Sequence, residues 1–195
     1  RLAQALRDIA PFSVADGVRA FYRIYAARHG KARWGDKTPG HVFAIPAIAA
    51  LLPEARFLHL IRDGRGAAAS IRPLWFAPSR DMAVLAGHWR DAVRAGMDAA
   101  RAGHPVLELR YEALLADPAA VLRRACAFLG LDYADAMLRY HERAPLRLAE
   151  HQGRIRADGT VLVSHAQRLA QQALVVTPPQ IGRAEAWRDN LLPQE

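Results

Sequence analysis

The amino-acid sequence predicts an α/β fold in which a parallel sheet is flanked by helices. Stretches with helical periodicity alternate along the chain with two short strand-like stretches, an order typical of α/β proteins. The first strand-like stretch, ARFLHLIRD (residues 55–63), is largely apolar and bounded by turn residues, as expected of a buried parallel strand. The second is VLELRY (residues 106–111). Two strands make a thin sheet, so we expect further strands that these patterns miss or that this chain lacks.

Two helical stretches precede the first strand. Residues 1–29 are expected to be helical, with Ser13 as an N-cap and Gly30 as a stop signal. The residues that recur at helical spacing between them are Val18, Phe21, Tyr22 and Tyr25. After a polar loop, KARWGDKTPGH, residues 41–53 (HVFAIPAIAALLP) predict a second helix that contains Pro46.

Helices are also predicted between and after the strands. GRGAAASIRPLW (residues 64–75) begins one, and Ser79 is expected to cap a long one that includes residues 81–103. After the second strand, Asp117 and Pro118 form an N-cap and a first-turn proline for AAVLRRACAFLGL.

The last third of the chain is less regular. A short helix is expected from about Ala134 to His141, and HAQRLAQQALVV is a possible helix within residues 144–180. We expect a single domain spanning residues 1–195.

Composition narrows the class of protein. The net charge is +8, which favours either a general arginine bias or an anionic partner. Nearly all the cations are arginines, because Lys31 and Lys37 are the only lysines. Cys126 is the single cysteine and lies in a helical pattern, so it is expected to be a small core residue in a protein without a disulfide framework. No run has the length and apolarity of a membrane span, and a cytoplasmic location is expected.

A glycine-rich turn follows the first strand. Gly64, Gly66 and Ala69 match the G-x-G-x-x-A pattern of dinucleotide-binding turns, which requires an acidic residue at a strand end about 20 residues later. The sequence there, VLAGHWRDA, is helical in pattern. Arg62, at the end of the strand and beside a helix N-terminus, instead indicates an anion site that the hydroxyl of Ser70 helps to form. The alternative is a tight strand–helix turn with a surface arginine.

Three segments in order extend this interpretation. WGDKTP (residues 34–39) precedes a helix and LLPEARFLHLIRDGRGAAAS, and VLELRYEALLADPAAVLRRACAFLGL follows after a long helix. Together they resemble the sulfotransferases that use 3′-phosphoadenosine 5′-phosphosulfate (PAPS), especially bacterial ones related to tyrosylprotein sulfotransferases. The resemblance runs from about Trp34 to Leu131, with a weaker echo in IGRAEAWRDNL (residues 181–191). It implies a P-loop-NTPase-like fold, with a parallel sheet flanked by helices, and PAPS as co-substrate without a metal.

The resemblance also implies residue roles. Arg62 and Ser70 match the pair that grips the 3′-phosphate of the cofactor, and Tyr111 of the Tyr-Glu pair matches the contact to adenine. Lys37 matches the catalytic lysine that approaches the transferring sulfuryl group, where a compact charge suits the negative charge that grows on the leaving phosphate. Arg183 is the candidate for a further basic contact to the 3′-phosphate.

The chain departs from the family at two points. It contains no phosphate-binding loop of the type Pro-Lys/Arg-Ser-Gly-Thr-Thr, so we expect it to be the C-terminal portion of a longer protein, unable to complete catalysis alone. The general base is also unassigned. The position that carries a histidine in cytosolic members is Pro39; His41 lies nearby but is favoured as a structural or exposed residue, and Asp36 as a residue that orients the loop.

Other functions remain open on the sequence alone. One is a different P-loop-type nucleotide-dependent transferase or kinase, which would require magnesium carboxylates. Another is a catalytically inactive nucleotide-binding fragment that keeps the 3′-phosphate half of the site. A nucleic-acid-binding module is disfavoured, because the arginines are scattered and do not alternate with aromatic residues. Residues 144–180, which contain His151 and His165, are expected to form a lid or acceptor wall. The acceptor itself and the oligomeric state cannot be predicted.

Overall fold

The computed structural model describes residues 2–150 and 152–189 and divides into two compact units. The first consists of Arg1–Phe57 and Ala95–Pro105, and the second of Leu58–Arg94 and Val106–Glu195. The single-domain expectation therefore stays a prediction, as does the lid role of residues 144–180. His151 and the last two residues of IGRAEAWRDNL lie outside the described residues.

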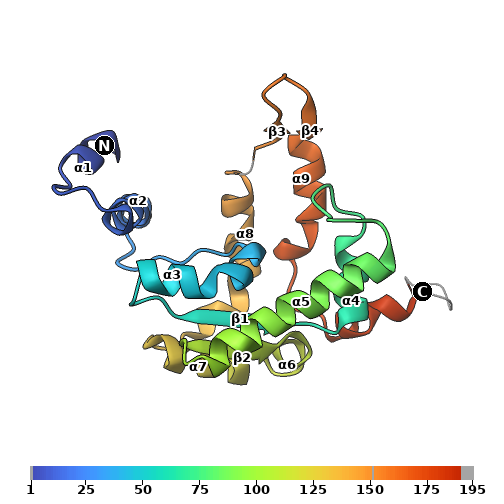
Figure 1. Cartoon of the computed structure of the whole chain (residues 1–195). Coiled ribbons are helices and arrows are strands. Elements are labelled where there is room, and N and C mark those ends of the chain that lie inside the picture. The colour runs from blue at the N-terminus through green and yellow to red at the C-terminus, as the bar shows by residue number, and fades with distance from the viewer. Residues whose placement is uncertain (1, 151, 190–195) are drawn as a thin grey trace. The chain divides into compact units, whose positions relative to one another are not determined.

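Helices dominate the described part of the chain (Figure 1). The α-helices are α1 (Leu2–Arg7), α2 (Val14–Arg28), α3 (Ile45–Leu51), α4 (Gly64–Ile71), α5 (Met82–Arg101), α6 (Tyr111–Ala116), α7 (Pro118–Leu129), α8 (Tyr140–Leu148) and α9 (His165–Gln171). Short 3₁₀ helices occupy Pro39–Ala44, Asp135–Arg139, Ala173–Val176, Ile181–Ala184 and Ala186–Asp189. The strands are β1 (Phe57–Ile61), β2 (Val106–Arg110), β3 (Arg154–Ile155) and β4 (Val161–Val163). None of the described helices is both long and apolar enough to cross a membrane.

The first unit follows the predicted helical pattern in part. Ser13 caps α2 by accepting the amide of Asp16 at 3.3 Å, and Gly30 follows the helix with a positive φ of 62°. The prediction of one helix over residues 41–53 is wrong, because a 3₁₀ helix ends at Ala44 and α3 starts at Ile45. Pro46 lies in the first turn of α3. Backbone N–H groups in a first turn have no intrahelical acceptor, so a proline there costs no helical hydrogen bond.

The predicted strands pair as a small parallel sheet. Figure 1 shows β1 and β2 side by side, and the amide of Phe57 donates to the carbonyl oxygen of Pro105 at 2.9 Å. Ile61 is buried, but Leu58 and Leu60 are 43% and 48% exposed. The prediction of a buried strand is therefore wrong for one face of β1, because the described residues cover that face only in part.

Short-range capping sets the ends of the helices in the second unit. Asp63 caps α4 by accepting the amide of Arg65 at 2.9 Å, and Asp117 caps α7 as predicted, by accepting the amide of Ala120 at 2.9 Å. The prediction that Ser79 caps the long helix is wrong. Asp81 accepts the first amides of α5, and Ser79 instead accepts the amide of Asp81.

The last third of the chain differs most from the prediction. The helix expected over residues 134–141 is a 3₁₀ helix followed by α8, which continues to Leu148. The antiparallel hairpin of β3 and β4, in which Arg154 pairs with Val163, was not predicted. A capping box between Ser164 and Gln167 sets the start of α9.

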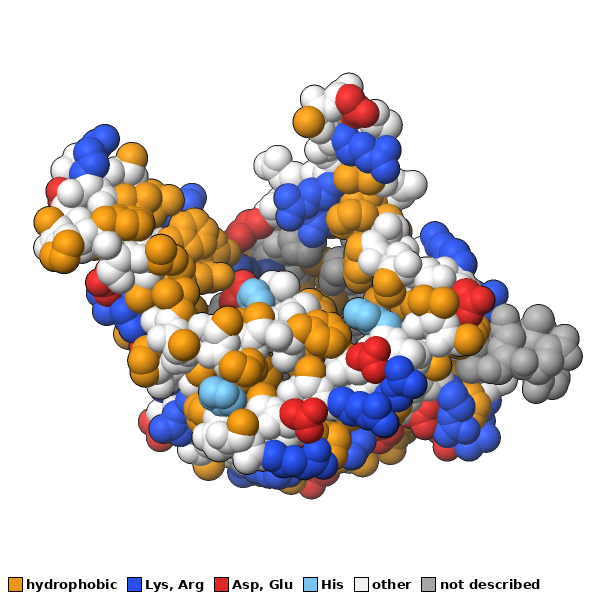
Figure 2. Space-filling view, in the orientation of Figure 1, with side chains coloured by type: hydrophobic (Ala, Val, Ile, Leu, Met, Phe, Trp, Pro, Cys, Tyr) orange, Lys and Arg blue, Asp and Glu red, His pale blue; other side chains and the backbone are white. Residues whose placement is uncertain are grey.

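The core of the second unit is built mainly from small and branched side chains. Its buried residues are Ile61, Ala68, Leu85, Leu109, Leu115, Ala125, Cys126, Ala144 and Val163. Cys126 is a free thiol that is 4% exposed, which confirms its predicted place in the core. Outside the core, Figure 2 shows hydrophobic side chains interspersed with charged ones at the surface.

Candidate functional site

Arg62 lies directly after β1, in the turn that leads into α4. Its Nη2 donates to the main-chain carbonyl oxygen of Arg183 at 2.9 Å, in a part-buried environment. Its Nε is buried and has no hydrogen-bond partner among the described residues. A buried guanidinium donor without a partner is costly, so this atom needs an acceptor that the described residues do not supply.

Tyr111 begins α6 and faces the same guanidinium. Arg62 Cζ lies 4.8 Å from the centroid of the Tyr111 ring, within the range of a cation–π contact. The structure thus brings Arg62, Tyr111 and the main chain of Arg183 together, although the sequence places them in three separate segments.

Ser70 lies in the last turn of α4 and is exposed. Four residues earlier on the same face of the helix is Gly66, and a Cβ there would lie 2.8 Å from Arg62 Nε. Arg62 therefore packs directly on the backbone of α4, and Ser70 follows one turn further on. The role of Ser70 in phosphate binding stays a prediction.

The N-terminus of α4 is already occupied by protein groups. The carboxylate of Asp63 accepts the amide of Arg65, and the amide of Asp63 itself donates to Glu112. The Arg65 guanidinium is the main reason that the pKa of Asp63 is lowered to about 2, against the opposing effect of burial. The expected anion site therefore depends on side chains such as that of Arg62 more than on the helix amides.

The sequence analysis missed two residues of this turn. Trp89 in α5 donates from Nε1 to the carbonyl oxygen of Arg62 at 3.0 Å, and Glu112 in α6 accepts the amide of Asp63 at 2.9 Å. The adjacent Tyr-Glu pair was a signal for Glu112, although only Tyr111 received a role. Trp89 carried no signal that separates it from an ordinary aromatic residue on an amphipathic helix.

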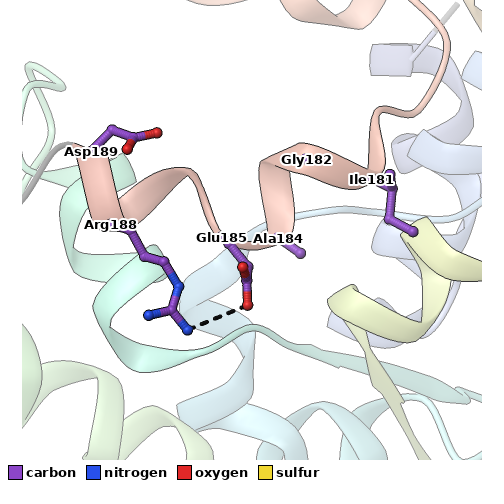
Figure 3. A pocket seen from close by; sticks show the side chains of 6 residues that line it. All are labelled: Ile181, Gly182, Ala184, Glu185, Arg188 and Asp189. Carbon is purple, nitrogen blue, oxygen red and sulfur yellow. Dashed lines mark hydrogen bonds and ion pairs between the residues drawn. The ribbon is translucent and has the colours of Figure 1, made fainter.

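The segment after Gln180 packs beside this turn. Arg65 Cζ lies 3.8 Å from the centroid of the Trp187 ring. An open hollow of about 500 Å³ is lined by Ile181, Gly182, Ala184, Glu185, Arg188 and Asp189 (Figure 3). The Glu185 carboxylate accepts a hydrogen bond from Arg188 Nη2 at 3.4 Å, and Asp189 adds a second carboxylate to the lining. These acidic groups make the hollow a poor site for a phosphate.

Lys37 lies in the first unit, on the loop between α2 and the 3₁₀ helix that starts at Pro39, and its side chain is exposed. Asp36 anchors this loop by accepting a 3.0 Å hydrogen bond from the hydroxyl of Tyr22, whose ring stacks on Trp34 at 4.2 Å. Arg62 belongs to the second unit, so the prediction that Lys37 and Arg62 act on opposite ends of one cofactor stays a prediction.

His41 is held by the same carboxylate. Its Nε2 lies 2.8 Å from Asp36 Oδ1. Burial acts to raise the pKa of Asp36, but hydrogen bonds from Thr38, Tyr22 and His41 lower it below its usual value. These contacts support the structural interpretation of His41 and the loop-orienting role of Asp36.

Two comparisons with known proteins show which proteins this chain resembles. The sequence model described as "Sulfotransferase family" matches residues 4–135, a range that contains Lys37, Arg62, Ser70 and Tyr111. Relatives named "Putative protein-tyrosine sulfotransferase" occur in Caenorhabditis briggsae and Caenorhabditis elegans. Each is 28% identical over 134 residues, which cover 65% of this chain and 48% and 52% of the two relatives. The chain thus spans about half the length of the curated relatives it matches. The match over residues 4–135 shows that this chain belongs to the sulfotransferase family.

Proposed function

We propose that this chain carries part of the active site of a PAPS-dependent sulfotransferase with a P-loop-like fold. Arg62, Ser70, Tyr111 and Arg183 hold the 3′-phosphoadenosine half of PAPS, and Lys37 acts on the sulfuryl half. The single observation that carries the proposal is the arrangement of Arg62, whose guanidinium lies against the Tyr111 ring and the main chain of Arg183.

The residues around Arg62 suit a 3′-phosphate. A guanidinium presents donors in a fixed fork that matches phosphate oxygens, and Arg62 Nε is a buried donor in need of an acceptor. Tyr111 restricts the guanidinium from one side and offers an aromatic surface beside it. Gly66 lets the side chain approach the backbone of α4.

Lys37 suits the half of the site that faces the sulfuryl group of PAPS. When bound, PAPS supplies the sulfuryl group that is transferred to an acceptor oxygen or nitrogen. The Lys37 ammonium, on a loop anchored through Asp36, stabilises the negative charge that develops on the leaving phosphate. The names of the relatives make a protein tyrosine hydroxyl the first acceptor to test.

A titration tests the proposal directly. The chain is titrated with 3′-phosphoadenosine 5′-phosphate (PAP), 5′-AMP and NAD, and the three dissociation constants are compared by calorimetry. We expect tightest binding of PAP and loss of that preference in Arg62→Ala. Equal affinity for all three ligands would rule out the site assignment. Transfer of labelled sulfate from PAPS to a tyrosine-containing peptide then tests the reaction itself.

A further inference from the structure

One peptide unit of the turn after β1 is held at both of its polar ends. Its carbonyl oxygen, from Arg62, accepts a hydrogen bond from Trp89 Nε1 at 3.0 Å. Its amide, from Asp63, donates to Glu112 Oε1 at 2.9 Å. Both bonds are part-buried, and they reach the turn from different helices, α5 and α6.

This peptide has no partner in regular secondary structure to fix it, because β1 ends at Ile61 and α4 begins at Gly64. Rotation of its plane would change the backbone angles on either side and redirect the Arg62 side chain. The guanidinium lies at the far end of a flexible side chain, so a small rotation at the backbone moves it by more than the tolerance of a hydrogen bond.

Packing reinforces the two hydrogen bonds. A Cβ at Gly64 would lie 3.0 Å from the Trp89 indole, so the turn lies directly against the ring. At the other end, Tyr111 and Glu112 are consecutive residues of α6. The first contacts the Arg62 guanidinium and the second holds the main chain that carries it. The direction of Arg62 therefore depends on α5 and α6 together.

We propose that Glu112 and Trp89 are positioning residues that give the site its selectivity for a 3′-phosphate, by fixing the Arg62–Asp63 peptide. The inference rests on the proposed function. Neither residue is assigned a contact with the ligand. Their effect falls on the ratio of the AMP and PAP dissociation constants, because both ligands share the adenosine 5′-phosphate part and differ in the group that Arg62 binds.

The test compares this ratio among variants of the chain. We expect Glu112→Ala to lower it about tenfold, the effect of losing one hydrogen bond to a charged group at this position. Glu112→Gln keeps a carbonyl oxygen as acceptor and is expected to stay within about threefold of the unmodified chain. Glu142→Ala, which removes an exposed glutamate paired with Arg139, is the matched control and is expected to leave the ratio unchanged.

Trp89→Phe tests the same positioning role if Glu112→Ala fails to fold. It keeps an aromatic ring against Gly64 and removes only the N–H donor. A lowered ratio in Trp89→Phe, with thermal unfolding close to that of the unmodified chain, supports the inference. A general loss of affinity for AMP and PAP alike in both Glu112→Ala and Trp89→Phe would indicate a merely structural role and overturn it.

The remaining outcomes separate this inference from the proposed function. If the unmodified chain prefers PAP, Arg62→Ala abolishes the preference and folded Glu112→Ala and Trp89→Phe retain it, the positioning role is wrong and the proposed function stands. If the unmodified chain shows no preference for PAP over AMP, both are wrong.

Discussion

Arg62 and Arg183 are 121 positions apart and are joined by a 2.9 Å hydrogen bond from Arg62 Nη2 to the main-chain carbonyl oxygen of Arg183. Because the acceptor is main chain, the contact does not depend on the identity of the side chain at position 183. The two arginines can therefore be separated by mutation, although they are assigned to the same phosphate.

Replacing these arginines one at a time is expected to have unequal effects. Arg62→Ala removes the central guanidinium and is expected to weaken PAP binding by about 10- to 100-fold. Arg183→Ala keeps the carbonyl that orients Arg62 and removes only a peripheral charge, for an expected loss of about three- to tenfold. Calorimetric titration with PAP measures both, and Arg139→Ala on the exposed surface is the control. A larger loss in Arg183→Ala than in Arg62→Ala would contradict the proposed hierarchy.

Gly66 is expected to matter for the ligand more than for stability. Alanine is favoured over glycine inside a helix by about 0.5–1 kcal/mol, but a Cβ at position 66 would lie 2.8 Å from Arg62 Nε. Since a flexible side chain can move away, Gly66→Ala is expected to fold and to weaken PAP binding about tenfold.

Gly87 in α5 supplies the matched control. Apart from its chain neighbours and the backbone of its own helix, no heavy atom of the described residues lies within 4 Å of a Cβ placed at this glycine. Gly87→Ala is expected to raise the free energy of unfolding by about 0.5–1 kcal/mol and to leave PAP binding unchanged. Unfolding in urea and calorimetric titration measure the two effects. If Gly66→Ala binds PAP as tightly as the unmodified chain, the close packing of Arg62 on α4 is not needed for binding.

Asp63 is expected to make stability depend on pH in the acidic range. Its pKa is lowered from 3.8 to about 2, chiefly by the hydrogen bond from Arg65 and despite burial. The folded state therefore binds fewer protons at this group than the unfolded state. Its contribution to stability is complete above about pH 4 and is lost as the pH falls toward about 2.

Asp63→Asn tests this pH dependence, since asparagine retains a capping oxygen without the charge. The difference in free energy of unfolding between the unmodified chain and Asp63→Asn is expected to shrink as the pH falls from about 5 to about 2. Urea titrations across this range measure it, with Asp91→Asn as the control for removing one exposed carboxylate. A difference that stays constant across the range would mean that the Asp63–Arg65 contact does not stabilise the fold.

Lys37 is expected to affect the reaction and not the binding of product. In a form of the protein that transfers sulfate from PAPS, Lys37→Ala is expected to lower the transfer rate by about 10²- to 10³-fold while PAP binding stays unchanged, because the charge it stabilises develops only during transfer. Lys31→Ala, at the only other lysine, is the matched control and is expected to have no effect. An equal fall in rate for both variants, or a loss of PAP binding in Lys37→Ala, would contradict the catalytic assignment.

Predictions that depend on neighbouring residues in the chain were the most successful. The N-caps Ser13 and Asp117 are confirmed because a cap contacts amides only two or three positions ahead. The prediction for Ser79 is wrong because Asp81, two residues later, is closer to the start of α5. Its carboxylate accepts the amides of Ala83 and Val84. The buried face expected of β1 also failed, because burial depends on what packs against Leu58 and Leu60 and not on their own apolarity.

By itself, the sequence was sufficient to identify the family and the two parallel strands and to nominate Arg62, Tyr111 and Arg183, because motif order and local periodicity are carried by neighbouring residues. Only the tertiary structure decided that Arg62 lies between Tyr111 and the main chain of Arg183, and that Trp89 and Glu112 hold its peptide. These contacts join residues 27 to 121 positions apart. Such contacts form only when β1, α5, α6 and the segment after Gln180 pack together, and local pattern carries no record of that packing.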